Sequence, residues 1–234
     1  GVTSGSTTND TSIALTFTSS EPIAEFAAID IDVTNGELSV FAGSGSVYTA
    51  TFTPAGPGAC TIDVSGNTFT DTAGNINTAA AGTFNWTYDN VSPTMTIEST
   101  TVGVTSGSTT NDTSIALTFT ASEEITGFDA GDIVVTNGTL SGFSGSGLVY
   151  TATFEPTGSG LCIIVINAGT FADVATNLSN LATQFTWTFV RSVSFLTDAL
   201  TIVHATDDGA TDVVSFVRPT GYEMADLNAT NFGG

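Results

Sequence analysis

Almost every side chain in this sequence that could take part in chemistry is a carboxylate. The 234 residues include 23 Asp and Glu but only two basic residues, Arg191 and Arg218, so the net charge is -21 at pH 7. A surface of this sign repels phosphate backbones and anionic lipid, which argues against nucleic-acid binding and attachment to a membrane surface. Divalent cations are the natural partners of such a chain.

Catalysis is not expected from these residues. The single histidine, His204, has no second histidine or nearby cysteine with which to form a metal centre. The carboxylates recur with an internal repeat, whereas acid-base catalysis needs one asymmetric pair. We therefore predict that the protein is not an enzyme and has no catalytic residues.

The internal repeat sets the domain organisation. The sequence GVTSGSTTNDTSIALTFT occurs at residues 1–18 and again at residues 103–120, an offset of 102. The same offset relates Cys60 to Cys162, and a one-residue deletion then relates Trp86 to Trp187. A period near 100 residues is the size of a whole module. We predict modules at 1–90 and 91–190, followed by a strand-rich tail at 191–234.

Alternation of apolar and polar residues predicts the fold of each module. The run IALTFT at residues 13–18 places its apolar side chains on one face, as a half-buried strand does. Asn35-Gly36 and Asn137-Gly138 stand between strand-like runs and predict type I′ hairpins. No window has convincing helical periodicity. Short strands joined by Gly, Asn and Ser turns predict an all-β protein built of two antiparallel β-sandwiches.

The cysteines and the aromatic runs are expected in the two cores. Cys60 and Cys162 lie on the apolar face of equivalent strands in different modules, too far apart for an intrachain disulfide. We predict two buried free thiols, with an intersubunit disulfide as the alternative. The runs FNWTY and FTWTF alternate in the same way, which favours core packing over a solvent-facing platform for sugars.

Five phrases, in the same order in both copies, carry a family resemblance. TSIALTFTSSEPI, GDIVVTNGTLSGFSGSG, YTATFTP, GNTFTDTAGN and FNWTYDNVSPT together resemble the bacterial Ig-like repeats of large surface adhesins and other extracellular proteins. The resemblance covers residues 1–190 and implies Ig-like sandwiches in a non-catalytic spacer or assembly module. It also implies an extracellular or cell-surface location.

The resemblance implies a calcium site as well. In such repeats a linker aspartate and oxygen ligands from adjoining loops hold Ca²⁺ at a module junction. Here it implies Asp71, Asn75 and Asp89 as ligands, and Ca²⁺ as the cofactor. The alternative is a solvated acidic surface. After the second module the pattern departs, because Thr176 replaces Gly74 and Val190 occupies the position of Asp89.

Seven N-x-[ST] triplets are candidate glycosylation sites in a eukaryotic secreted protein, although such triplets also arise by chance in a chain this rich in Asn and Thr. They begin at Asn9, Asn85, Asn90, Asn111, Asn137, Asn177 and Asn228. No apolar run approaches the roughly 20 residues of a membrane-spanning helix, so no membrane insertion is expected. Any glycan or host-surface ligand is unknown.

A difference between the copies predicts a contact between subunits. Copy 2 is preceded by SPTMTIESTTV, in which Met95 and Ile97 read as inward residues of a first strand. Copy 1 has no counterpart, and a sandwich without an edge strand is a template for strand addition. In the tail, Leu200 and Ile202 repeat the spacing of Met95 and Ile97. The tail of one subunit is thus a candidate donor strand for the next.

A second difference lies on the strand LCIIVI. Ile163 and Val165 replace Thr61 and Asp63 on its outer face, so a neighbouring subunit or the tail is expected to cover them. The predicted function is a structural subunit of an extracellular filament or surface assembly, with copies of itself as partners and head-to-tail growth by strand addition. The alternative is a calcium-stiffened stalk or ligand-binding module of an adhesin. A longer array, or a tail folded over Ile163 and Val165, would also explain these features.

Overall fold

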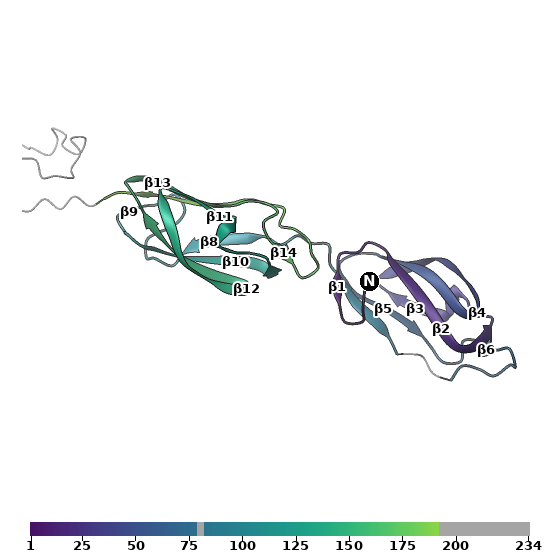
Figure 1. Cartoon of the computed structure of the whole chain (residues 1–234). Helices are drawn as coiled ribbons and strands as arrows, with labels where there is room; N and C mark the ends of the chain where they lie inside the picture. The colour runs from purple at the N-terminus through teal and green to yellow at the C-terminus, as the bar shows by residue number, and fades with distance from the viewer. Residues whose placement is uncertain (79–81, 192–234) are drawn as a thin grey trace, which may run out of the picture. The chain divides into compact units, whose positions relative to one another are not determined.

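The computed structural model describes residues 1–78 and 82–191, which form two modules of β-strands (Figure 1). Within this part of the chain the only helices are two single turns of 3-10 helix, η1 (Ala28–Asp30) and η2 (Ala130–Asp132). No helix of this part is long and apolar enough to cross a membrane. The prediction of an all-β fold is confirmed. The predictions for the tail concern residues outside the described part of the chain, among them Leu200, Ile202, His204 and Asn228.

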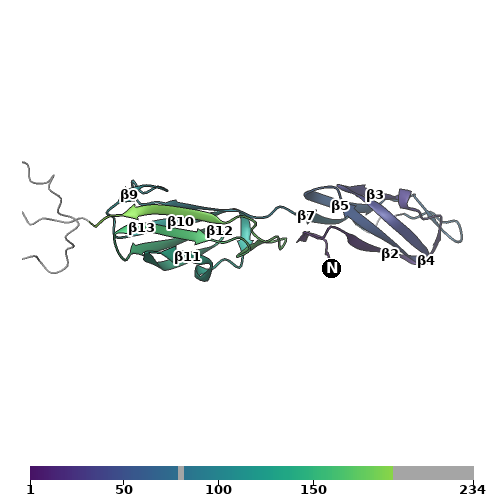
Figure 2. The same cartoon turned by 90° about the horizontal axis from the view of Figure 1, so that it is seen from above.

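Module 1 denotes strands β1 to β7. They are β1 (Thr7–Thr8), β2 (Ile13–Ala24), β3 (Ile31–Thr34), β4 (Gly36–Pro54), β5 (Gly58–Val64), β6 (Thr70–Asp71) and β7 (Phe84–Tyr88). One sheet has the order β1-β7-β5-β3 and the other β4-β2-β6. Figure 2 shows β3 and β5 side by side and the long β4 beside β2.

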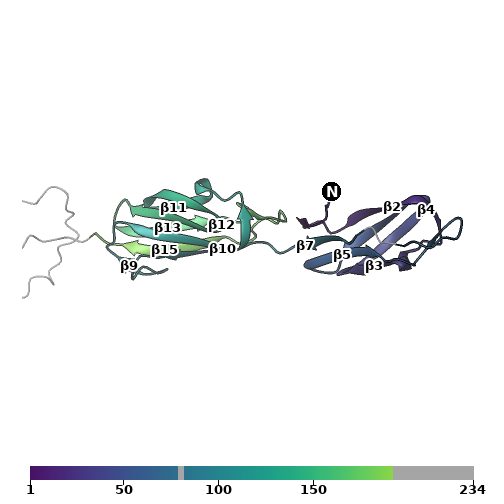
Figure 3. The same cartoon turned by 90° about the horizontal axis from the view of Figure 1, so that it is seen from below.

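Module 2 denotes strands β8 to β15 and repeats this arrangement. They are β8 (Met95–Ser99), β9 (Thr109–Thr110), β10 (Ile115–Thr126), β11 (Ile133–Thr136), β12 (Gly138–Pro156), β13 (Gly160–Ile166), β14 (Ala172–Asp173) and β15 (Thr183–Phe189). The sheet orders are β11-β13-β15-β9 and β12-β10-β14 (Figure 3). In addition, β8 pairs antiparallel with β10.

The alternation in the sequence places side chains as expected. In β4, Tyr48, Ala50 and Phe52 are buried, whereas Val47 and Thr49, on either side of Tyr48, are exposed. The aromatic runs also point inward, which confirms the prediction of core packing. Trp86 packs edge-on against Phe52 and Trp187 against Phe154, with ring centroids 4.9 and 4.6 Å apart. Each module therefore has an aromatic centre of its own.

The predicted hairpins at the Asn-Gly pairs are wrong. The strands on either side of Asn35-Gly36 belong to different sheets, because β3 pairs with β5 and β4 with β2. Asn35 has a φ of 56°, and its Nδ2 donates to the carbonyl of Gly56 at 2.8 Å. A Cβ at Gly36 would lie 2.2 Å from the ring of Phe52. The pair is thus a corner between sheets, where glycine is needed for close packing.

The two modules differ at one edge of β2 and β10. In module 2, β10 pairs with β12 on one side and with β8 on the other (Figure 1). In module 1, β2 pairs with β4 in the same register, but no strand among the described residues pairs with it along residues 15–19 on the other side. Among the described residues, β2 therefore has an unpaired edge at the place that β8 fills in module 2, and we call it the open edge of module 1.

Both thiols are free and buried. Burial raises the pKa of Cys60 and of Cys162, although hydrogen bonds from Asn35 and Asn137 partly oppose that rise. Both thiols should therefore react slowly at neutral pH, because burial limits the access of a reagent and the raised pKa keeps the thiols protonated.

A thiol reagent should accordingly label Cys60 and Cys162 slowly in the native protein and rapidly after denaturation. Mass spectrometry of the labelled protein over time measures both rates. Fast labelling of native protein, or a covalent dimer on a non-reducing gel, would contradict the buried placement.

Candidate functional site

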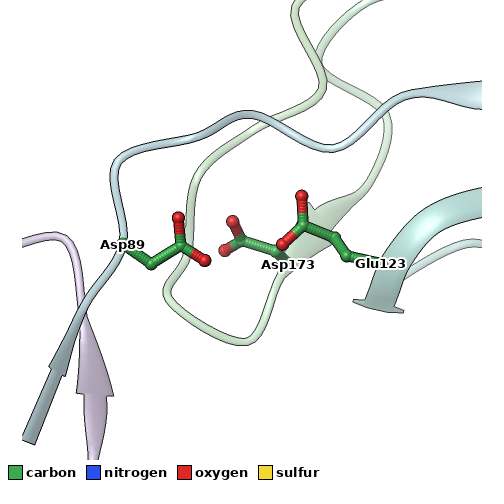
Figure 4. Close-up of side chains that lie close together, drawn as sticks. All are labelled: Asp89, Glu123 and Asp173. Atoms are coloured by element: carbon green, nitrogen blue, oxygen red, sulfur yellow. The ribbon is translucent and has the colours of Figure 1, made fainter. Parts of the chain in front are cut away.

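Three carboxylates converge at the start of module 2. Asp89 comes from the segment between β7 and β8, Glu123 from β10 and Asp173 from the end of β14. One ligand oxygen of each lies within 4.8 Å of those of the other two. Figure 4 shows the three side chains pointing toward one another. We call these three residues the carboxylate cluster.

Asn177 holds two members of the carboxylate cluster in place. Its backbone N–H donates to Oδ1 of Asp173 at 2.8 Å, and its side-chain Nδ2 donates to Oδ2 at 2.8 Å. The same Nδ2 donates to the backbone carbonyl of Asp89 at 2.9 Å. Asp173 is only 2% exposed. The loop after β14 and the segment before β8 are thus joined through one amide.

Glu123 completes the cluster from a distortion in β10. The pairing of β10 with β12 shifts register between Thr120 and Ile125, which re-aims the side chains between them. Burial raises the pKa of Glu123 above its usual range, and the charges of Asp89 and Asp173 raise it further. The three groups therefore repel one another when all are ionised, and a cation between them would relieve that repulsion.

The ligand chemistry fits a hard cation. Every candidate ligand atom in the cluster is a carboxylate oxygen, and three carboxylates supply up to six oxygens. Ca²⁺ takes six to eight oxygen ligands, whereas zinc sites are built mainly from sulfur and nitrogen. The cluster is the one group of three or more such side chains found within residues 1–78 and 82–191.

The structure separates the three residues that the sequence resemblance groups as calcium ligands. Asp89 lies in the carboxylate cluster, whereas Asp71 and Asn75 hydrogen bond to each other in module 1. The Asn75 amide lowers the pKa of Asp71. Asp173 and Asn177 are their counterparts in module 2, at the offset of 102. The resemblance thus implied the right kind of loop, with an Asp and an Asn four residues apart. Asp89, however, lies beside the loop of module 2, the module that follows it in the sequence.

Sequence reasoning missed Glu123 and Asp173, although a signal was available. Asp89 precedes β8 by only a few residues, and β8 belongs to module 2, so its partners had to be sought in that module. The repeat offset then gives Asp173 directly from Asp71. Glu123 is harder to find, because its equivalent Glu21 is exposed although β2 has the same register shift as β10, so the repeat does not show which copy of this carboxylate is half-buried.

Six of the seven glycosylation candidates lie among the described residues. The side-chain nitrogens of Asn9, Asn137 and Asn177 already donate hydrogen bonds, which a glycan would have to displace. Asn85, Asn90 and Asn111 lie on exposed positions.

Ile163 and Val165 are half-buried on the outer face of β13. There Val165 pairs with the exposed Val134 of β11. A role for this face in a subunit contact stays a prediction.

The open edge of β2 borders a second candidate site, a groove of about 1120 Å³ in module 1. Apolar core residues line it, among them Leu15, Phe17, Val64, Phe69 and Phe84. All five are half-buried, whereas their counterparts in module 2 are buried in the core that also contains Met95 and Ile97 of β8. We call this feature the module 1 groove. It exposes apolar side chains and unpaired backbone together, which is what a β-strand can bind.

Comparison with known proteins gives a family and two structures. Residues 1–88 and 89–190 each match the family model described as bacterial Ig-like domain. The structure of Yersinia pseudotuberculosis InvD is 16% identical, with a TM-score of 0.40, over 83% of this chain and 57% of that one. Invasin, described as a bacterial integrin-binding protein, is 16% identical, with a TM-score of 0.40, over 80% and 38%.

This chain thus spans little more than half of InvD and less than half of invasin. No curated protein matches it. The second family match begins at Asp89, so this aspartate falls within the second domain together with Glu123 and Asp173.

Thr176 provides a test of the loop that carries Asp173. Its φ is 73°, in the left-handed region, where Gly74 stands in module 1 with a φ of 91°. A side chain there costs about 1–2 kcal/mol, against about 0.5–1 kcal/mol for the extra backbone freedom of glycine. Thr176→Gly should therefore stabilise module 2 by about 0.5–1 kcal/mol.

Calorimetric unfolding measures this change. The reverse substitution Gly74→Thr is the matched control and should destabilise module 1 by a similar amount, because no atom lies near the added Cβ. A loss of stability in Thr176→Gly would contradict the backbone argument.

Proposed function

The chain belongs to the bacterial Ig-like domain family, and from that premise we propose that it is a structural subunit of an extracellular surface assembly. Copies join head to tail when one adds a β-strand to the open edge of module 1 in the next. The observation that supports this proposal is the edge of β2 beside the module 1 groove, which has no partner strand among the described residues. Catalysis has no part in it.

The burial of side chains on β10 supports strand addition as the way in which the open edge of β2 is closed. Leu117 and Phe119 are 1% and 0% exposed beneath β8, but the identical residues Leu15 and Phe17 are half-buried. A strand placed on β2 would remove this apolar surface from water, at about 25 cal/mol per Å². It would also pair the backbone groups along residues 15–19. Both gains favour a partner that is itself a strand.

Closing the edge within one chain should abolish assembly. A variant that carries residues 92–102 a second time, ahead of Gly1, gives module 1 its own equivalent of β8. We expect this variant to be monomeric in light scattering and to form no polymers in electron micrographs, while the parent polymerises. The reason is that the groove is filled from within the same chain.

The matched control is the same extension with Asp in place of the copied Met95 and Ile97. Charged residues at the two inward positions cannot enter the groove, so this variant should polymerise like the parent. Polymers that persist with the unaltered extension would contradict strand addition to β2.

A second candidate function, the calcium-stiffened stalk, is favoured by the carboxylate cluster. Asp89, Glu123 and Asp173 would hold the ion, and Asn177 would keep two of them in position. Bound Ca²⁺ supplies positive charge that balances the three carboxylates. The segment between β7 and β8 would then be fixed to the loop after β14, which stiffens the entrance to module 2. Such a stalk would carry a binding domain or ligand site elsewhere in a surface adhesin.

Calcium should raise the melting temperature of module 2, by an amount equivalent to about 2.7 kcal/mol at 100 times the Kd. Glu123→Gln should remove most of this rise because it deletes one ligand. Glu21→Gln, at the exposed equivalent position in module 1, is the control and should leave the calcium effect unchanged. Equal calcium effects in both variants, or none in the parent, would contradict the site.

The pH dependence in chelator follows from the raised pKa of Glu123. The folded state holds this proton more tightly than the unfolded state, so stability from this group falls as pH rises above the usual pKa of about 4.3. Glu123→Gln should therefore melt higher than the parent at pH 7 without calcium, and the difference should shrink toward pH 4.

A further inference from the structure

Module 2 carries an apolar surface on the outer side of the sheet that contains β13. Alternate residues of β13 are buried in the core, so the residues between them, Leu161, Ile163 and Val165, point to the other side of the sheet. Val134 of β11 lies directly opposite Val165 and extends the same surface. Leu161 and Val134 are 53% and 51% exposed. We call these four residues the apolar face.

The same positions in module 1 are small or polar. Subtracting the offset of 102 from the four residue numbers of the apolar face gives Asp32, Ala59, Thr61 and Asp63. Asp32 and Asp63 stand directly opposite each other, as their valine counterparts do in module 2. Two carboxylates so placed repel each other and keep the surface hydrated. Because both modules form the same sandwich, the sandwich itself does not require the apolar residues.

No charged residue occupies an outward position of β11, β13 or β15. The other outward positions of these three strands are Thr136, Gln184, Thr186 and Thr188. Thr136 and Thr186 flank Ile163 on its two sides. The chain has 23 carboxylates and a net charge of -21. In such a chain, a surface of three adjacent strands with apolar residues and no charge indicates a contact surface.

The position of the apolar residues distinguishes two kinds of contact. Within the described residues β11 is the edge of its sheet, in the order β11-β13-β15-β9, so an added strand would pair with β11. Such a strand would leave Leu161 and Ile163 uncovered, because they lie on β13, one strand in from the edge. A second sheet laid over the surface would cover all four residues. The apolar face therefore fits face-to-face packing.

Charge selects the partner that lies on the apolar face. A basic partner would be attracted by carboxylates, but module 2 lacks the two that module 1 has at these positions. An acidic partner needs a patch without charge, because carboxylates that face one another repel. A second copy of this chain is acidic and carries the same patch. A two-fold axis through the patch brings apolar side chains onto apolar side chains.

We propose that the apolar faces of two copies pack against each other about a two-fold axis, so that module 2 of one chain lies on module 2 of another. This contact is independent of the strand addition proposed above, because it uses another module and the face of a sheet in place of its edge. In a surface assembly it joins chains side by side.

The size of the apolar face predicts a weak contact. Strands of seven residues, as in β13 and β15, together with β11, cover about 14 Å by 23 Å, or about 300 Å² in plan. A standard interface buries about 800 Å² on each partner. We therefore expect monomers at about 1 μM and dimers above about 100 μM. Chains held together in an assembly meet at millimolar effective concentration, so a weak contact is sufficient there.

The first experiment exchanges residues between the modules. It uses the full chain with residues 92–102 repeated ahead of Gly1, which closes β2 in every variant. Sedimentation equilibrium of this parent from about 1 μM to about 1 mM should show dimers at the upper end. Val134→Asp, Ile163→Thr and Val165→Asp together give module 2 the residues of module 1. This variant should stay monomeric over the whole range.

The matched control makes the opposite exchange. Asp32→Val, Thr61→Ile and Asp63→Val give module 1 an apolar face while module 2 keeps its own. The average mass at a given concentration should then exceed that of the parent. Each exchange introduces residues that the other module already carries in the same strands, so both variants should fold, which a thermal melt checks.

A second experiment locates the contact by cross-linking. Thr186→Cys places a thiol beside Ile163 and leaves the apolar face intact. Packed sheets lie about 10 Å apart, so a flexible bismaleimide that spans about 15 Å should link two copies through this thiol at about 200 μM. Asn85→Cys, the equivalent position in module 1, is the control and should give several-fold less dimer. The native Cys60 and Cys162 are buried in both variants.

Three results would overturn the proposal. The first is a parent that stays monomeric up to about 1 mM. The second is a dimer that the exchange in module 2 does not weaken, or that links equally well through position 85. The third is slow labelling of Thr186→Cys by a monofunctional maleimide in a monomeric chain, which would mean that the same chain covers the face. None of these results bears on strand addition, because β2 is closed in every variant.

Discussion

The antiparallel pairing of β8 with β10 supplies both the backbone partners of a sheet edge and two side chains of a core. A sandwich of this size depends on covering the inner face of each sheet and pairing its strands. In module 2 one chain meets both needs. In module 1 the same positions of β2 are left with a groove and an open edge. The proposed contact between copies follows from this one difference.

Charge limits how either module can be used. With a net charge of -21, two copies repel each other unless the contact is apolar or screened. An apolar strand added to β2 in the module 1 groove would meet the first condition. Within one copy, Asp89, Glu123 and Asp173 lie close enough together to share a cation, which would screen these three charges. The assembly and stalk proposals are therefore compatible, because the groove lies in module 1 and the carboxylate cluster lies at the start of module 2.

Much of the fold could be predicted because its causes are local. The alternation in the run at residues 13–18 arises because one face of a strand packs on the core and the other faces water, and the inward cysteines follow the same rule. The Asn35-Gly36 prediction failed for a reason that is not local. A positive φ at Asn35 suits a hairpin turn, but close packing of Gly36 on Phe52 sends the chain into the other sheet. Turn chemistry alone does not reveal which strands will pair.

The sequence by itself determined the repeat, the strands, the inward faces and the supply of oxygen ligands, because each depends on residue type and spacing. Only the tertiary structure decided what identical residues do. Leu15 and Leu117 stand in the same eighteen-residue sequence, yet among the described residues only Leu117 is covered, because β8 lies beside β10 and no described strand lies at that edge of β2. Likewise Asp71 and Asp173 form the same loop, but only Asp173 meets Asp89, because the segment that carries Asp89 leads into module 2.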